Sequence, residues 1–489
     1  MTASASAAAS PRAPLHQIFA FSMLGMPIAG VALIYGVYLP PHLVNLGIGA
    51  FKPGAGQALL AVTFAVTVVG LLNVFFDPLA ALLMDRTRTP IGRYRPWLVV
   101  GTPLAMLGVA SLLTPPGPVG ELYVIVWLFL SFAGLSMVTL GQTAWSAVLA
   151  TTYDDRSRLW GWFSALGVVA TVLVLLLPVF TGDRVSAGRK ASMPIIGWIF
   201  VIWLPIALVI TAALTPERVV APAKVQRFSL GDYRQALGRP IMARLMCADF
   251  LLALGPGVTG PLYLFFFHDA KGFAVPDISV LLIFYIVAGV FGSLFWGRLA
   301  ERIGKHRTLQ ISCVTYAVSQ TALMSLPRVW PGYGLIDCIP TAILMFAVGF
   351  SNAAFIVMVR AMVADVIDEV RLEQKQDLTS LLYSMVTTTT KIGGSITVAI
   401  VYPILAFVGY NGAEGAVNTK SAIFGLEMCY LFAPVVLVLI GGSLFFGYRL
   451  DSKRHAEIRA ALASPDFLAA EEGLIGRPIE PAEGSAAPA

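Results

Sequence analysis

Long apolar stretches recur along the whole chain and are separated by short polar segments. Examples are 62–75, 124–138, 168–180 and 196–214. A helix that crosses the hydrocarbon core of a bilayer needs about 20 predominantly apolar residues, and windows of that size predict twelve transmembrane helices in an all-α membrane protein. They lie near residues 17–43, 57–84, 97–114, 121–150, 158–182, 192–215, 241–267, 277–300, 308–326, 335–364, 379–410 and 422–448.

The composition agrees with this interpretation. Hydrophobic residues make up 57% of the 489 positions and charged residues only 12%, and the mean hydropathy is +0.79. Soluble domains carry roughly 25% charged residues, so the bilayer is the main solvent of this chain. The segment 1–16 lacks the basic start and short apolar core of a cleaved signal, so the first helix is expected to act as an uncleaved insertion signal.

The basic residues are distributed unevenly over the loops. Of the 33 Lys and Arg residues, 25 fall on one side of the predicted map, 7 fall on the other, and Lys391 lies inside a predicted span. Cytoplasmic loops are enriched in Lys and Arg, so we expect a multi-pass protein of a bacterial inner membrane with both termini in the cytoplasm. This topology accounts for the net charge of +6, which therefore gives no argument for nucleic-acid binding.

The longest cytoplasmic connection divides the predicted helices into two sets of six. Two loops at corresponding positions of these halves, 85–95 and 297–307, each place an acid and an Arg at a helix end, then a turn Gly and two more basic residues. Paired halves of this kind are typical of carriers that rock about a site at the midplane of the membrane. The expected division is a disordered tail 1–16, an N-terminal half 17–215, a cytoplasmic linker 216–240, a C-terminal half 241–449 and a cytoplasmic tail 450–489.

Several short motifs follow one another between residues 17 and 410. They are Leu39-Pro40-Pro41, Asp77-Pro78, Asp85-Arg86-Thr87-Arg88-Thr89, Gly92-Arg93-Tyr94-Arg95-Pro96-Trp97, Gly304-Lys305-His306-Arg307, Ala364-Asp365-Val366-Ile367-Asp368, Tyr383-Ser384 and Lys391-Ile392-Gly393-Gly394. In this order the chain resembles the glycoside–pentoside–hexuronide:cation symporters of the major facilitator superfamily, the melibiose-permease-like proteins. The resemblance implies two six-helix halves and cation-coupled transport.

Motifs for ATP binding or for enzymatic chemistry are absent from the sequence. There is no Gly-x-x-x-x-Gly-Lys-Ser/Thr loop, no His-Glu-x-x-His and no Gly-x-Ser-x-Gly. We therefore expect a transporter and not an enzyme. Its expected partners are the lipid bilayer, a small-molecule substrate and a coupling cation, H⁺ or Na⁺, with no other cofactor, and the protein is expected to be a monomer.

One acid and one base stand out within the predicted spans. Asp77 lies eight residues before Asp85, about 12 Å along a helix that rises 1.5 Å per residue, and Lys391 has a similar depth in the eleventh span. Charge at mid-bilayer is costly, so such residues are functional hypotheses by default. We expect Asp77 to bind the cation and Lys391 to couple it, by neutralising Asp77 when the cation is absent. A static buried ion pair is the alternative, and Asp249 is a weaker candidate for a second site.

The helix around Asp77 departs from the family pattern. Family members usually carry Arg-x-x-Asp-x-x-x-Asp-Pro, and the corresponding positions here are Gly70, Asn73, Asp77 and Pro78. Asn73 shares a helical face with Asp77, so both are expected at the cation site, but Asn73 brings no charge. Hard cations prefer several oxygen ligands that include carboxylates. The single acid therefore favours H⁺ over Na⁺.

The expected substrate site offers few hydrogen-bonding groups. The acids that melibiose-type members carry on two helices correspond here to Met26 and Gly141, whereas Trp145 matches a family Trp that provides a stacking platform. A hydroxyl-rich sugar needs several buried polar partners, so a glycoside with an apolar aglycone, or another amphiphilic solute, is expected. The substrate-facing residues are expected to be Tyr35, Gln142, Thr143, Trp145 and Trp162.

Charged residues at the cytoplasmic helix ends are expected to form a gate. A carboxylate beside guanidinium groups can clamp neighbouring helix ends through contacts that form and break. The alternative is ordinary solvated charge at helix ends. The expected gate residues are Asp85, Arg86, Arg93, Arg156, Arg158, Glu301, Arg302, Asp365 and Asp368.

The sequence leaves three functions open. The first is H⁺-coupled symport of a glycoside-like or amphiphilic solute by alternating access. The second is a lysolipid or drug carrier, or an exporter, on the same fold, because a related branch handles lysophospholipids. The third is a membrane sensor that does not transport.

Overall fold

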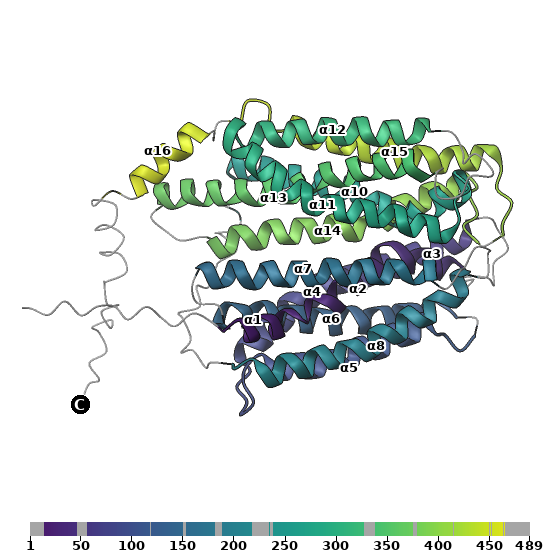
Figure 1. Cartoon of the computed structure of the whole chain (residues 1–489), viewed down its shortest axis with the longest axis horizontal. Helices are drawn as coiled ribbons and strands as arrows, with labels where there is room; N and C mark the ends of the chain where they lie inside the picture. The colour runs from purple at the N-terminus through teal and green to yellow at the C-terminus, as the bar shows by residue number, and fades with distance from the viewer. Residues whose placement is uncertain are drawn as a thin grey trace, which may run out of the picture.

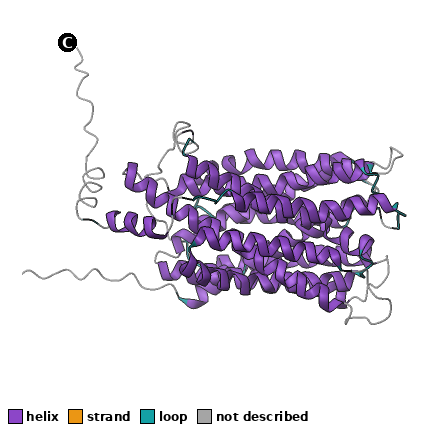
Figure 2. Cartoon of the chain, turned by 90° about the horizontal axis from the view of Figure 1, so that it is seen from above, coloured by secondary structure: helices purple, strands orange, loops and turns teal. Residues whose placement is uncertain are grey.

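The computed structural model describes the chain as a bundle of long, roughly parallel helices (Figures 1 and 2). Within the described residues there is no β-strand, and the single isolated bridge joins Thr89 and Gly92. The described residues are 14–45, 56–117, 119–149, 153–180, 188–217, 234, 238–326, 338–374, 379–413, 415–448, 450, 452–462 and 464.

The helices form two groups that lie on opposite sides of the bundle in Figure 1. The first group comprises α1 (Leu15–Ser22), α2 (Gly25–Leu33), the π-helical turn η1 (Ile34–Tyr38), α3 (Leu39–Asn45), α4 (Gln57–Arg86), α5 (Arg95–Leu113), α6 (Glu121–Leu149), α7 (Tyr153–Phe180) and α8 (Gly188–Leu214). The second comprises α10 (Pro240–Phe265), the π-helical turn η2 (Phe266–Ala270), α11 (Val275–Ile303), α12 (Lys305–Ser325), α13 (Ile339–Gln374), α14 (Thr379–Phe407) and α15 (Lys420–Ser443), followed by the short α16 (Ser452–Leu462).

Eleven helical stretches among the described residues are long and apolar enough to cross a bilayer. The predicted span 308–326 corresponds to α12, which is 21 residues long but more polar than its neighbours. Several of its polar side chains face other helices: Thr308, Ser312 and Gln320 are buried, and Gln320 donates to the Tyr430 carbonyl on α15 at 3.1 Å. Packing against α13 and α15 thus shields polar side chains from lipid and, at Gln320, provides a hydrogen-bond acceptor. A hydropathy average counts the same side chains as unfavourable.

The first span is a broken helix rather than the continuous one that its apolar pattern predicts. Pro27 has no N–H to donate to the Met23 carbonyl, and the Met26 N–H takes that acceptor instead at 3.2 Å. Gly25 lies so close to α7 that an added Cβ would be 2.6 Å from the Phe163 carbonyl oxygen. Further along, the π-helical turn η1 widens the helix, a feature that is frequent at functional sites.

The two groups of helices meet along α4 with α14 and along α7 with α11, and the first span also contacts α10. At the end of the bundle that holds α3 and η2, the Tyr38 hydroxyl lies 3.3 Å from Ser279 Oγ. Gly260 of α10 is so close to η1 that a Cβ there would be 2.9 Å from the Gly36 carbonyl oxygen. We call this the closed end. The opposite end, where α4 ends at Arg86 and α5 begins at Arg95, is called the basic end.

The helix α13 is longer than predicted. Its predicted span ended at residue 364, but the helix continues to Gln374, because Asp365 and Asp368 on the added turns contact α12 and α16. Most of the predicted linker 216–240 and the tails 1–13 and 465–489 lie outside the described residues. The division into domains therefore stays a prediction.

Candidate functional site

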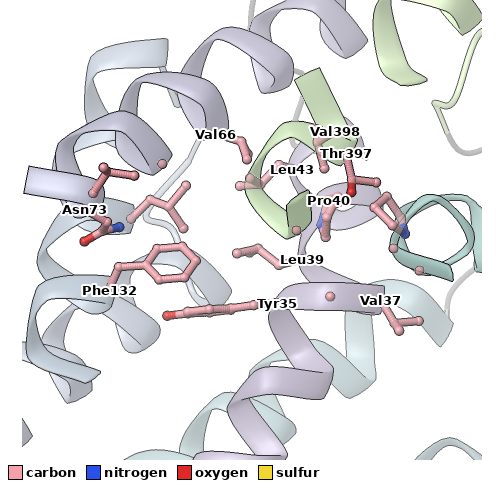
Figure 3. Close-up of a pocket in the computed structure, with 18 of the residues that line it drawn as sticks. Tyr35, Val37, Leu39, Pro40, Leu43, Val66, Asn73, Phe132, Thr397 and Val398 are labelled. Atoms are coloured by element: carbon pink, nitrogen blue, oxygen red, sulfur yellow. The ribbon is translucent and has the colours of Figure 1, made fainter. Parts of the chain in front are cut away.

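A pocket of about 540 Å³ lies between the two groups of helices (Figure 3). The first group contributes residues of η1, α3, α4 and α6, and the second contributes residues of α10 and α14. At the closed end the lining residues Leu39 and Leu43 are almost fully buried, with exposed fractions of 3% and 0%. The pocket is therefore sealed on that side by apolar packing.

Asp77 and Asn73 both line this pocket from α4, as their four-residue spacing predicts. The Asn73 Oδ1 atom is buried and accepts no hydrogen bond from the described residues. Pro78 follows Asp77 within the helix and has no N–H, so the Val74 carbonyl lacks its usual intrahelical donor. One turn of α4 therefore offers the pocket a carboxylate, an amide oxygen and a backbone carbonyl, which suit a proton or a small cation.

Lys391 lies on α14, whose residue Gly394, less than one turn further on, lines the same pocket. The Lys391 side chain lies outside the described part of the structure. Its backbone position is compatible with a role at the pocket. The expected pairing with Asp77 stays a prediction.

Tyr35 lines the pocket from η1, as expected, and its hydroxyl is hydrogen-bonded to Ser131 Oγ of α6. The ring of Phe132, which also lines the pocket, lies beside it with a centroid separation of 4.9 Å and a tilt of 49°. Figure 3 shows the two rings together on one wall. Phe132 was not predicted, because it lies in the predominantly apolar part of α6, where no run of polar residues distinguishes the pocket side.

The other expected substrate residues lie elsewhere. Trp145 is fully buried, packs edge-on against Phe21 and lies under the Arg95 guanidinium at 5.3 Å, so its ring is part of the packing of the first group. Gln142 is likewise buried, with 2% exposure. Trp162 is 40% exposed and lies outside the pocket lining.

The pocket sides of α6 and α14 remain accessible toward the basic end. Thr143 lies seven residues beyond Ser136, and Thr390 lies four residues before Gly394, so each shares a helical face with a pocket-lining residue. Both threonines are exposed, and Thr143 donates to the Thr139 carbonyl of its own helix at 2.7 Å. Thr143, the fifth expected substrate residue, thus lies between the pocket and the basic end.

A second membrane-embedded acid lies on α10. Asp249 is 9% exposed and accepts a hydrogen bond from Thr390 Oγ1 at 2.8 Å. The Arg360 guanidinium of α13 lies within electrostatic range of its carboxylate. Asp249 thus connects α10 and α13 to the turn of α14 that carries Lys391, and it lies outside the pocket lining.

The Glu217 carboxylate organises the loop between α4 and α5 at the basic end. Its Oε1 atom accepts from the backbone N–H groups of Arg93 at 2.5 Å and Tyr94 at 2.9 Å, and Oε2 accepts from that of Arg95 at 3.4 Å. The Arg95 guanidinium donates to the Thr215 carbonyl at 2.7 Å. A carboxylate is stabilised at a helix N-terminus, so Glu217 caps α5 and fixes this loop to the end of α8.

Gly92 is required by this arrangement, and Gly92→Ala is expected to loosen it. Gly92 has a φ of +120°, and an added Cβ would lie 2.0 Å from Glu217 Oε2. We expect a loss of about 1–3 kcal/mol, measured as a lower midpoint of thermal unfolding in detergent. Gly120→Ala is the matched control, because a Cβ there meets no atom within 4 Å. Equal midpoints for the two variants would contradict this account.

The expected gate residues whose side chains the structure describes do not form one cluster. Arg158 pairs with Asp155 of its own helix at 3.5 Å. Asp365 accepts from Lys305 of α12 at 2.5 Å. Arg86, Glu301 and Arg302 are exposed helix-end residues, and the side chains of Asp85 and Arg156 lie outside the described part of the chain.

His455 attaches the terminal helix α16 to α13. Its Nε2 atom lies 3.2 Å from Asp365 Oδ1 and 3.1 Å from Asp368 Oδ2. Ile458, one turn later, is 1% exposed. Two carboxylates and one apolar anchor thus hold α16 against the bundle.

Replacing His455 with Ala is expected to release α16. Charge-assisted hydrogen bonds contribute about 1.5–3 kcal/mol, so amide exchange in residues 452–462 should accelerate about tenfold or more. Hydrogen–deuterium exchange with mass spectrometry measures this. The control is Glu457→Ala, which removes a pair with Arg454 on the same helix, in which both side chains are more than half exposed. The account fails here if both variants exchange as the parent protein does.

Curated relatives match most of the chain. The lactose permease of Lactobacillus delbrueckii subsp. bulgaricus is 23% identical over 469 residues, which are 88% of this chain and 69% of the relative. The human sodium-dependent lysophosphatidylcholine symporter 1 is 24% identical over 425 residues, 79% of this chain and 76% of the relative. The inner membrane symporter YicJ of Escherichia coli is 23% identical over 383 residues, 75% and 80% of the two chains.

Solved structures share the fold. A variant of the nucleoside transporter NupG has a TM-score of 0.63 at 16% identity, covering 88% of this chain and 99% of that one. The inward open conformation of the xylose transporter XylE from Escherichia coli has a TM-score of 0.59 at 11% identity, covering 91% and 98%. The family model described as MFS/sugar transport protein matches residues 20–452. The chain therefore belongs to the MFS/sugar transport protein family of the major facilitator superfamily, and it is a membrane transporter and not an enzyme.

Proposed function

We propose that this protein is a secondary active symporter that moves a glycoside-like or amphiphilic solute together with H⁺ by alternating access. The observation that carries the proposal is the pocket between the two groups of helices, where Asp77 and Asn73 lie against mostly apolar walls. A site shared by two mobile halves can face each side of the membrane in turn. The family membership supports transport, and the lactose permease and the symporters among the relatives support a solute–cation pair.

Asp77 is proposed as the cation site and Lys391 as its coupling partner. A protonated Asp77 no longer attracts the Lys391 ammonium, so proton binding changes the charge balance across the pocket. Asp77 is the single carboxylate that α4 contributes to the described pocket lining, which supports H⁺. The carbonyl of Val74 and Asn73 Oδ1 add oxygen atoms that would also suit Na⁺, which remains the alternative coupling ion.

The orientation follows from the distribution of basic residues. Arg86, Arg93, Arg95 and Lys305 lie at the basic end, and the enrichment of basic residues in cytoplasmic loops supports placing this end in the cytoplasm. If α12 is counted together with the eleven other candidate spans, the number of spans is twelve. An even number places both termini on the same side, the cytoplasm. The structure then corresponds to an inward-facing state, with the outer side sealed by Tyr38, Ser279 and the apolar residues of α3.

A lysolipid carrier on the same fold is the second candidate. The apolar pocket walls favour it, and a human relative is by its name a lysophosphatidylcholine symporter. The membership in a transporter family argues against the non-transporting sensor.

Uptake into proteoliposomes tests the proposal. Labelled methyl glycosides, lactose and lysophosphatidylcholine are offered under an imposed pH gradient or an imposed sodium gradient. We expect one solute class to accumulate under the pH gradient and to stop accumulating when a protonophore is added. Uptake that continues after both gradients have been collapsed would rule out coupling.

A further inference from the structure

The two walls of the pocket have different shapes. The first group of helices presents the rings of Tyr35 and Phe132, whereas the second presents Gly257 and Gly260 of α10 and Gly394 of α14. A Cβ added at Gly394 would meet no atom within 4 Å, so the space in front of this glycine is open cavity. The second group also contributes Pro256, Pro261, Thr397 and Val398 to the lining. An aromatic wall thus faces a wall that is open at Gly394, and a slot lies between them.

The aromatic wall is held in a fixed position. The hydrogen bond between the Tyr35 hydroxyl and Ser131 Oγ fixes the Tyr35 ring, and the tilt of 49° between Tyr35 and Phe132 leaves ring faces and edges available on one surface. Aromatic side chains bind flat rings through offset or edge-to-face contacts, which contribute beyond the apolar area that they bury. This wall therefore favours a ring over a flexible alkyl chain.

The polar groups of the slot are mainly acceptors. Asn73 lies next to Phe132 at one end of the slot (Figure 3), and its buried Oδ1 accepts no hydrogen bond from the described residues. Thr397 Oγ1, at the other wall, already donates to the Gly393 carbonyl at 3.0 Å. A buried acceptor without a donor is costly, so the solute is expected to bring a hydroxyl or N–H to Asn73.

From this geometry we infer that the transported solute is an aryl glycoside. Its aromatic aglycone packs against Tyr35 and Phe132, opposite Gly394, and a sugar hydroxyl donates to Asn73 Oδ1. A free sugar would leave the apolar walls without a partner. A lysolipid phosphate would lie near the Asp77 carboxylate, which repels an anion. The inference rests on the proposed function, because it takes the pocket to be the transport site.

Matched pairs of glycosides test this inference by binding alone. The full-length protein in lipid nanodiscs is titrated calorimetrically with the phenyl and methyl β-D-glycosides of glucose, galactose and xylose, and with lysophosphatidylcholine. In at least one pair we expect the phenyl compound to bind about tenfold more tightly than its methyl counterpart. Phe132→Ala should reduce this preference to less than about threefold, because the ring contact is lost.

The matched control is Phe129→Ala, one turn earlier on α6, where the ring packs against Phe76 outside the pocket lining. This variant should keep the phenyl preference. The inference is wrong if no phenyl glycoside binds more tightly than its methyl counterpart, if the preference survives Phe132→Ala unchanged, or if lysophosphatidylcholine alone binds. In each of these cases, gradient-driven uptake of another solute would still support the symport proposal. Conversely, a phenyl preference in binding without gradient-driven uptake would contradict only the symport proposal.

Discussion

Asp77→Asn is expected to abolish accumulation of the solute against its gradient. With one proton moved per solute, a pH difference of about two units sustains a concentration ratio of roughly 100, because each pH unit corresponds to about 1.4 kcal/mol. Asn resembles a permanently protonated Asp and cannot release the proton on the inner side. The ratio should therefore fall to about 1, while exchange of labelled for unlabelled solute across the membrane continues. Steady-state uptake and counterflow in proteoliposomes measure the two quantities.

Asp249→Asn provides the matched comparison for this experiment. It removes another buried acid of a long helix, but Asp249 is not among the residues that line the pocket. We expect this variant to accumulate solute, with a ratio well above 1. Full accumulation by Asp77→Asn would show that the cation acts elsewhere.

The second large effect is expected from Gly394→Leu. The new side chain would extend into the open space of the slot, where a Cβ meets no atom within 4 Å, and would take the place of the solute. Leu is also a better helix former than Gly by about 1 kcal/mol. We therefore expect solute affinity to fall about 100-fold or more, a loss of about 2.7 kcal/mol, without a fall in the midpoint of thermal unfolding.

Gly297→Leu is the control for this substitution. Gly297 is also a helical glycine whose added Cβ would meet no atom within 4 Å, but it lies on α11 outside the pocket lining. Its solute affinity should equal that of the parent protein. Normal binding by Gly394→Leu would mean that the solute does not occupy this slot.

Hydropathy predicted the long helices well, because the requirement for about 20 apolar residues is a physical constraint of the bilayer. Hydropathy predicted spans and helix ends less well where a helix is surrounded by other helices instead of lipid. Several polar residues of α12, such as Ser312 and Gln320, are buried where it packs against other helices, and this helix is too polar to be recognised by hydropathy alone. Similarly, α13 continues past its predicted end, because contacts with α12 and α16 stabilise its charged last turns.

The site was only partly predictable for a related reason. Asp77 and Asn73 could be placed together because their spacing puts them on one helical face. Trp145 and Thr143 are two residues apart on a helix that mixes polar and apolar residues around this turn, and nothing in that pattern says that one is buried in packing and the other exposed. The partners of Glu217 lie more than 120 residues away along the chain, a distance over which local patterns carry no information.

The central claim is that the solute and a cation move together through the pocket that Asp77 lines. The most direct measurement uses a solute gradient to drive cation movement. Proteoliposomes without any imposed cation gradient contain a pH-sensitive dye, and the solute that binds most tightly is added outside. The account predicts that solute entry acidifies the lumen with the parent protein and leaves the pH unchanged with Asp77→Asn. Solute entry through the parent protein without movement of either protons or sodium would contradict it.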